Sequence, residues 1–86
     1  MRIEFHRSFK KQYKKLSVKI QQQFDERLLL FEREPFHPIL RNHPLGGVRG
    51  GQWSINVTGD WRAVYVFQGK DTVVFIDIDT HSNLYQ

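Results

Sequence analysis

The hydrophobic periodicity of the chain changes once, and this change limits the possible fold more than any other feature. In the first part, apolar residues recur at helical spacing: Phe9, Tyr13 and Leu16, then Ile20, Phe24, Leu28 and Phe31. Beyond Pro35 and Pro38 come three runs rich in β-branched and aromatic residues, QWSINV, WRAVYVF and TVVFIDIDT. A period near 3.6 indicates amphipathic helix, whereas such short runs indicate strands. The sequence therefore predicts helices followed by a sheet.

Local signals predict where the helices begin and end. Ser8 and Ser17 are candidate N-caps, because a serine hydroxyl accepts a hydrogen bond from the free N–H groups of a first helical turn. The second helix should run to Glu34, since a proline follows and disfavours helical geometry in the residue before it. Ahead of both helices, MRIEF alternates polar and apolar residues and predicts a short strand with Ile3 and Phe5 inward.

The three later runs predict an antiparallel meander, because TGD and QGKD between them are glycine-containing turn signals. If Gly69 and Lys70 form a two-residue turn, Gln68 pairs with Asp71 and Arg62 falls opposite Asp77. In that register, the face apolar enough to meet the helices carries Ala63, Tyr65, Phe67, Val74, Ile76 and Ile78. The opposite face, too charged to be core, carries Arg62, Val64, Phe75, Asp77, Asp79 and His81.

These parts combine into an α+β fold in which an N-terminal strand and a helical hairpin pack on an antiparallel sheet. At 86 residues, the chain is expected to form one domain, residues 1–86. Such a domain buries about 60–65% of the surface that its unfolded chain exposes, so every element must share the core.

Composition excludes several classes of protein. The sequence has no cysteine, which removes disulfides and thiolate chemistry and favours a reducing cytoplasm. The N-terminal MRIEFHRSFKKQ lacks the apolar stretch of a signal peptide, and no segment approaches the roughly 20 apolar residues of a membrane span. A soluble cytoplasmic protein with no membrane partner is expected.

Positive charge is concentrated near the N-terminus. The chain has 13 Lys and Arg against 9 Asp and Glu, a net charge of +4. The excess falls on Arg2, Arg7, Lys10, Lys11, Lys14, Lys15 and Lys19, opposed in that stretch only by Glu4. This distribution fits a polyanionic partner, and a solvated helix face is the alternative.

The polar residues favour acid–base chemistry over metal or nucleotide binding. The histidines, His6, His37, His43 and His81, show no paired ligand spacing, so no metal site is expected. GGVRGG lacks the lysine and serine of a P-loop and precedes a strand, so a flexible connector is expected. An imidazole exchanges protons near neutral pH, and a nearby arginine stabilises charge on a phosphate. Metal-free cleavage of RNA needs those groups.

Three motifs together resemble the YafQ branch of the RelE/ParE superfamily, the small toxins of bacterial toxin–antitoxin modules. They are HPLGG, then GQWSINVTGDWRAVYVF with its Asp-Trp pair, and the C-terminal DTHSNLYQ. The resemblance extends over nearly the whole chain and implies a RelE-like two-layer fold. It also implies a ribosome-dependent mRNA endonuclease that needs no cofactor and is inhibited by a partner antitoxin.

The resemblance assigns roles by position. His43 in the His-Pro-Leu motif and His81 near the C-terminus stand at the positions of catalytic histidines. Asp60 and Trp61 match the Asp-Trp pair. Tyr85 matches a terminal aromatic residue that stacks on or orients RNA.

Two positions depart from the family pattern. Asn56 stands where the pattern has another histidine, and Asp77 stands where it has an arginine. Arg62, expected opposite Asp77, is the candidate to supply the missing cation. In the resulting assignment His81 protonates the leaving oxygen, and His43 or Asp60 acts as the base or orients it. Ribosomal RNA phosphates are gripped by Lys10, Lys11, Lys14 and Lys15.

Four of these assignments have a structural alternative, whereas packing explains His81 poorly. His43 could be a loop residue, Trp61 a core residue, Asp60 a turn residue, and Arg62 the ion-pair partner of Asp77. At the level of function, the alternatives are a ParE-like inhibitor of DNA gyrase and a basic RNA-binding module without catalysis. The residue pair at the C-terminus, an imidazole and an aromatic ring, favours the nuclease.

Overall fold

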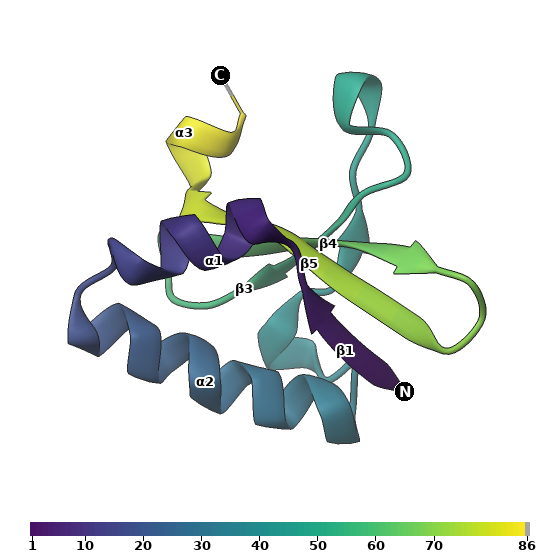
Figure 1. Cartoon of the computed structure of the whole chain (residues 1–86), viewed down its shortest axis with the longest axis horizontal. Helices are drawn as coiled ribbons and strands as arrows, with labels where there is room; N and C mark the ends of the chain where they lie inside the picture. The colour runs from purple at the N-terminus through teal and green to yellow at the C-terminus, as the bar shows by residue number, and fades with distance from the viewer. Residues whose placement is uncertain (86) are drawn as a thin grey trace.

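The computed structural model describes residues 1–85 and has a five-stranded sheet, in the order β1-β5-β4-β3-β2, with helices packed on it (Figure 1). The strands are β1 (Arg2–Phe5), β2 (His43–Pro44), β3 (Trp53–Asn56), β4 (Trp61–Gln68) and β5 (Thr72–Thr80). The helices are α1 (Arg7–Lys14), α2 (Val18–Arg33) and α3 (His81–Leu84), with 3-10 turns η1 (Pro38–Leu40) and η2 (Gly47–Arg49). The predicted α+β class is confirmed.

The antiparallel meander of β3, β4 and β5 forms as predicted. β1 lies at the outer edge and runs parallel to β5, because the helical hairpin carries the chain back across the sheet. β2, a further strand that the sequence did not indicate, pairs antiparallel with β3. Within residues 1–85, no helix is both long and apolar enough to cross a membrane.

The N-cap of α1 differs from the predicted one. The helix begins at Arg7, and the His6 Nδ1 atom accepts a hydrogen bond from the Ser8 backbone N–H at 3.0 Å. The Ser8 hydroxyl instead donates to the carbonyl oxygen of Ile76 at 2.7 Å. Ser8 therefore fastens α1 to β5 and does not cap its own helix.

The bounds of α2 follow the sequence signals. Ser17 is the N-cap as predicted, and its hydroxyl accepts from the Ile20 N–H at 3.3 Å. The helix ends at Arg33 with Glu34 as its C-cap. The proline after Glu34 prevents a further turn.

Aromatic rings join the helical hairpin to the sheet. The ring of Phe24 on α2 lies 5.1 Å from Phe9 on α1 and 5.5 Å from Phe75 on β5, measured between centroids. Phe31, nearer the end of α2, lies 5.1 Å from Tyr65 on β4. All these rings are 2% exposed or less. Burying them against one another supplies most of the apolar contact between the two layers.

The register of β4 against β5 corrects the predicted one. A three-residue loop, 69–71, replaces the expected two-residue turn, so Gln68 pairs with Thr72. A bulge then leaves Ile76 without a partner, which moves the register by one more residue. Arg62 consequently pairs with Asp79 and not with Asp77.

The two shifts change which β5 side chains face the helices. Phe75, predicted to point away, is fully buried in the core, and Val74 and Ile76, predicted inward, lie outside the core cluster. Beyond the bulge the alternation returns to the predicted phase. Ile78 is therefore buried and Asp77 lies on the opposite face, as expected.

Candidate active site

The β2 segment holds His43 in one orientation. Its Nδ1 atom lies 2.7 Å from the carbonyl oxygen of Arg41. Because a carbonyl oxygen can only accept, Nδ1 must carry the proton of this bond. The neutral ring then leaves Nε2 as an acceptor. His43 is exposed, so Nε2 is accessible to a substrate.

His81 opens α3 directly after β5. The Thr80 hydroxyl caps the helix by accepting from the Asn83 N–H at 3.3 Å, and the His81 N–H donates to the Asp60 carbonyl oxygen at 2.8 Å. The rings of His81 and Tyr85 lie 4.6 Å apart between centroids. The backbone of His81 is thus fastened to the turn before β4, and its ring lies against Tyr85.

Arg62 is fastened to the turn between β3 and β4. Its Nη1 atom donates to the carbonyl oxygens of Thr58 at 3.0 Å, Gly59 at 3.2 Å and Trp61 at 3.0 Å. The suggested ion pair with Asp77 is not present, because the Asp77 carboxylate lies 3.8 Å from Arg49 instead. All three bonds use the same nitrogen of the Arg62 guanidinium.

These elements meet around a hollow of about 480 Å³. Its lining residues are Arg41, His43, Leu45, Asn56, Arg62, His81 and Tyr85. The lining therefore combines two imidazoles with two guanidinium groups, and none of these described residues carries a carboxylate. Such a hollow attracts an anion and offers groups that can move protons.

Four residues named from the sequence, His43, Arg62, His81 and Tyr85, are brought together in this hollow. Asp60 and Trp61 are not among its lining residues. The Asp60 backbone carbonyl accepts the His81 N–H, and Trp61 is half-buried against the hydrophobic core. The structural alternative therefore describes Trp61 better than base stacking does.

Sequence reasoning missed one basic residue of the hollow, Arg41. It follows η1 with φ at +45°, in the left-handed region, and precedes the strand that carries His43. The sequence offers only its position two residues before His43 as a signal.

The lysines of α1 fall into two pairs on different surfaces. Lys11 and Lys15 line a hollow of about 420 Å³ together with Arg49 and Asp77. This basic hollow continues toward the imidazoles, because Arg49 also lines a neighbouring hollow that ends at Tyr85. Lys10 and Lys14 lie elsewhere.

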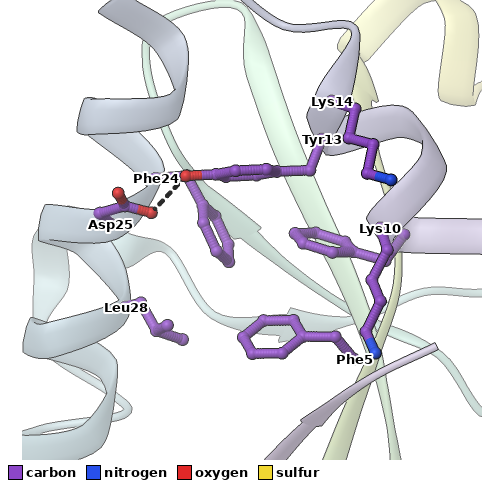
Figure 2. Close-up of a pocket in the computed structure, with 8 residues that line it drawn as sticks. Phe5, Lys10, Tyr13, Lys14, Phe24, Asp25 and Leu28 are labelled. Atoms are coloured by element: carbon purple, nitrogen blue, oxygen red, sulfur yellow. Dashed lines mark hydrogen bonds between the residues drawn. The ribbon is translucent and has the colours of Figure 1, made fainter. Parts of the chain in front are cut away.

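Lys10 and Lys14 border an aromatic groove of about 440 Å³ between the two helices of the hairpin. Figure 2 shows them on the α1 wall, with Asp25 and Leu28 on the α2 wall and aromatic rings between. The Tyr13 hydroxyl donates to the Asp25 carboxylate at 2.9 Å across this groove. Burial, and next this bond and the carboxylate charge, raise the pKa of Tyr13.

A metal centre is not built by the side chains that the structure describes. In residues 1–85, no group of three or more His, Cys, Asp or Glu side chains is arranged to hold a metal ion.

Several solved structures with the same arrangement of strands and helices are described as toxins. The Escherichia coli BL21(DE3) YafQ structure matches with a TM-score of 0.81 at 22% identity, covering 100% of both chains. The YoeB/ParE toxin from Agrobacterium tumefaciens matches with a TM-score of 0.76 at 22% identity, covering 94% of this chain and 99% of that chain. A chain of the E. coli DinJ-YafQ toxin-antitoxin complex matches with a TM-score of 0.70 at 24% identity, covering 98% of this chain and 96% of that chain.

A comparison with curated proteins returned no match. The family described as the bacterial toxin of type II toxin-antitoxin system, YafQ, matches residues 1–86. This chain therefore belongs to the YafQ family of type II toxins.

Proposed function

We propose that this toxin cleaves mRNA on the ribosome by metal-independent general acid–base catalysis. The observation that carries the proposal is the hollow in which His43 and His81 meet Arg41 and Arg62 without a carboxylate in the lining. A base, an acid and cations facing one site are the groups that phosphodiester cleavage through the ribose 2′-OH requires.

The hydrogen bond of the His43 ring supports a division of the two proton transfers between the two histidines. His43 acts as the base, because its Nε2 is free to accept while Nδ1 donates to the Arg41 carbonyl. It takes the proton of the 2′-OH as that oxygen attacks phosphorus. His81, protonated, gives its proton to the 5′-oxygen as the bond from phosphorus to that oxygen breaks. The products are a 2′,3′-cyclic phosphate and a 5′-hydroxyl end.

The remaining groups stabilise and orient the reacting phosphate. Arg62 has Nη1 bound to the turn carbonyls, which holds the guanidinium in place for its other N–H groups to face the phosphorane. Tyr85, 39% exposed and beside His81, stacks on a base of the mRNA. Asp60 contributes through its backbone carbonyl by holding the His81 N–H.

Lys11 and Lys15 are the lysines that we assign to ribosomal RNA phosphates. Their hollow adjoins the candidate active site through Arg49 and Tyr85. Phosphate contacts need charge and not base recognition, so a lysine pair suffices. Binding to ribosomes would place the protein in the cytoplasm.

An antitoxin is the protein partner that we propose for the aromatic groove. The groove is apolar, and Lys10 and Lys14 border it, so it fits an amphipathic segment with apolar anchors and flanking carboxylates. One structure that this chain resembles is that of the E. coli DinJ-YafQ toxin-antitoxin complex. Expression of this chain alone should harm a bacterial host, and co-expression of the neighbouring small reading frame should relieve the harm.

One experiment tests the nuclease directly. Purified protein is added to a coupled translation system, and the 5′ ends of the mRNA are mapped with and without an inhibitor of initiation. We expect new 5′-hydroxyl ends inside reading frames only when ribosomes translate. Folded protein that produces no new ends would contradict the proposal, and a supercoiling assay would then test the gyrase alternative. Cutting of naked mRNA would contradict the dependence on ribosomes.

A further inference from the structure

Arg49 makes contacts with three separate parts of the molecule. Its Nε donates to the Leu84 carbonyl oxygen at 3.1 Å, and its Nη1 donates to the Gln52 side-chain oxygen at 2.8 Å. Its Nη2 lies 3.8 Å from the Asp77 carboxylate. The side chain is 27% exposed, so this arginine is largely enclosed by its partners.

The glycine-rich loop that carries Arg49 forms an ordered, hydrogen-bonded turn, not the flexible connector expected from its sequence. Two backbone hydrogen bonds close the loop. The Leu45 N–H donates to the Gln52 carbonyl at 2.8 Å, and the Gln52 N–H donates to the Arg49 carbonyl at 3.0 Å. Gly47 and Gly51 take φ values of +62° and +87°, which other residues rarely adopt. The loop therefore holds the Arg49 backbone in one position.

The element that Arg49 holds has little stability of its own. α3 has only 4 residues, and a single helical turn does not persist in water without tertiary contacts. The last carbonyl groups of a helix have no partner within it, and the Arg49 guanidinium supplies one for Leu84. In Figure 1, α3 and the teal loop rise on the same side of the molecule, away from α2.

We infer that Arg49 is a positioning residue that clasps α3 and thereby keeps His81 and Tyr85 in the candidate active site. Arg49 does not line the hollow that holds the two histidines, so it acts through α3. The catalytic consequence of this inference rests on the proposed nuclease function. The effect of Arg49 on the packing of α3 can be measured without any reaction.

The contact between Arg49 and α3 also suggests a role for Asp77. This carboxylate replaces the arginine expected from the family pattern, and it faces the cation that fastens the terminal helix. The Asp77 Oδ1 atom accepts from the Ile78 N–H at 2.8 Å, which leaves Oδ2 as the atom that faces Arg49. Asp77 thus supports Arg49 instead of contacting the phosphate.

The test compares Arg49→Gln, Arg49→Lys and a control, Arg33→Gln, which removes the same charge from an exposed position on α2. Nuclear Overhauser contacts between the His81 and Tyr85 rings report the packing of α3. Protection of the Tyr85 N–H, which donates to the His81 carbonyl at 3.2 Å, reports its helical turn. Single-turnover cleavage on programmed ribosomes and ribosome affinity are measured in parallel, and urea unfolding checks the fold.

We expect Arg49→Gln to lose the ring contacts and the amide protection and, with ribosomes in saturating excess, to cleave about 100-fold more slowly, the effect of a displacement of about 1 Å in a catalytic group. Arg49→Lys should behave like Arg49→Gln, because an ammonium group lacks the planar guanidinium that donates to the Leu84 carbonyl oxygen and the Gln52 side-chain oxygen at once. Arg33→Gln should match the wild type in every measurement.

Retained ring contacts in Arg49→Gln, or a normal rate after their loss, would overturn the inference, and so would wild-type behaviour of Arg49→Lys. Reduced ribosome affinity with intact ring contacts would make Arg49 an RNA contact and overturn it as well. If Arg49→Gln unfolds, Gln52→Ala removes the bond that orients Nη1 and should loosen α3 in the same way. If the wild type does not cleave, the proposed function fails, and the magnetic resonance comparison alone decides whether Arg49 holds α3.

Discussion

At the scale of single residues, backbone carbonyl groups hold residues of the candidate active site in place. The Arg41 carbonyl selects the tautomer of His43, the Asp60 carbonyl holds the backbone of His81, and three carbonyls hold Arg62. A carbonyl oxygen can hold an N–H without adding a negative charge to the site. The hollow therefore keeps the positive charge of its arginines while the His43 and Arg62 side chains are held in one orientation.

Replacing either histidine by alanine should lower single-turnover cleavage by about 100- to 10,000-fold, the usual contribution of one acid or base group. The free energy of unfolding should change little, because both side chains are exposed. His6→Asn is a matched control, since His6 lies outside the hollow and asparagine can still cap α1. Normal cleavage by His43→Ala or His81→Ala would exclude the assigned role of that residue.

Ser54 carries a buried hydroxyl that finds no hydrogen-bond partner within residues 1–85. An unsatisfied buried polar group costs about 1–3 kcal/mol, so Ser54→Ala should raise the free energy of unfolding by about 1 kcal/mol. Ser17→Ala, which removes the N-cap of α2, should lower it by about the same amount. Urea unfolding measures both changes, and a destabilised Ser54→Ala would reveal a partner for the hydroxyl.

At the scale of elements, α1 presents two different surfaces. Its lysines recur at a spacing of four residues, which puts each pair on one side of the helix. One pair borders the aromatic groove against α2, and the other borders the basic hollow near α3. A helix that the sequence describes as a single basic face therefore separates two proposed partners.

Replacing each lysine pair should weaken the binding of a different partner. Lys11→Gln with Lys15→Gln should weaken ribosome binding and reduce the slope of log affinity against log salt by about 0.7–0.9 for each lost phosphate contact. Lys10→Gln with Lys14→Gln removes the same charge and should weaken antitoxin binding instead. Both affinities are measured for both double variants by titration at several salt concentrations. Equal effects of the two pairs would show that only total charge matters.

At the scale of the whole molecule, Tyr65 ties the sheet to the segment that leads to His43. Its hydroxyl donates to the Asn42 side-chain oxygen at 2.8 Å, and the Asn42 amide donates to the Pro35 carbonyl at 3.0 Å. Burial raises the pKa of Tyr65. The folded state therefore favours the neutral phenol.

This raised pKa predicts how stability depends on pH. The unfolded chain loses the Tyr65 proton near pH 10 and the folded protein loses it only at higher pH. The contribution of Tyr65 to the free energy of unfolding is therefore constant below pH 10 and falls above it. Tyr65→Phe should make this fall shallower, and Tyr13 should retain part of it. At pH 7 the same variant should lose about 1 kcal/mol, because Asn42 loses its donor. Urea unfolding between pH 7 and 11 measures both effects, and an unchanged fall would contradict the raised pKa.

What the sequence by itself determined is mostly local. The Ser17 cap and the proline after Glu34 define α2. Runs rich in β-branched and aromatic residues, with glycine-containing turns between them, define the three meander strands. These signals act between residues a few positions apart. His43, His81 and Tyr85 could be named in advance from their motifs. Arg62 was named from an expected place opposite Asp77, although it pairs with Asp79. The same local reasoning missed β2, which is too short to show a period.

The tertiary structure alone decided three features. They are the register of β5 against β4, the position of Arg49 beside α3, and the parallel pairing of β1 with β5. The loop 69–71 and the bulge at Ile76 each shift β5 by one residue, and neither costs much locally. Burial of Phe75 among the rings of α1, α2 and β4 selects them, and these contacts join residues far apart in the chain. Arg49 reaches Leu84 only because the folded loop brings the two together. A composition rich in glycine carries no information about that contact, since it depends on where the rest of the chain has folded.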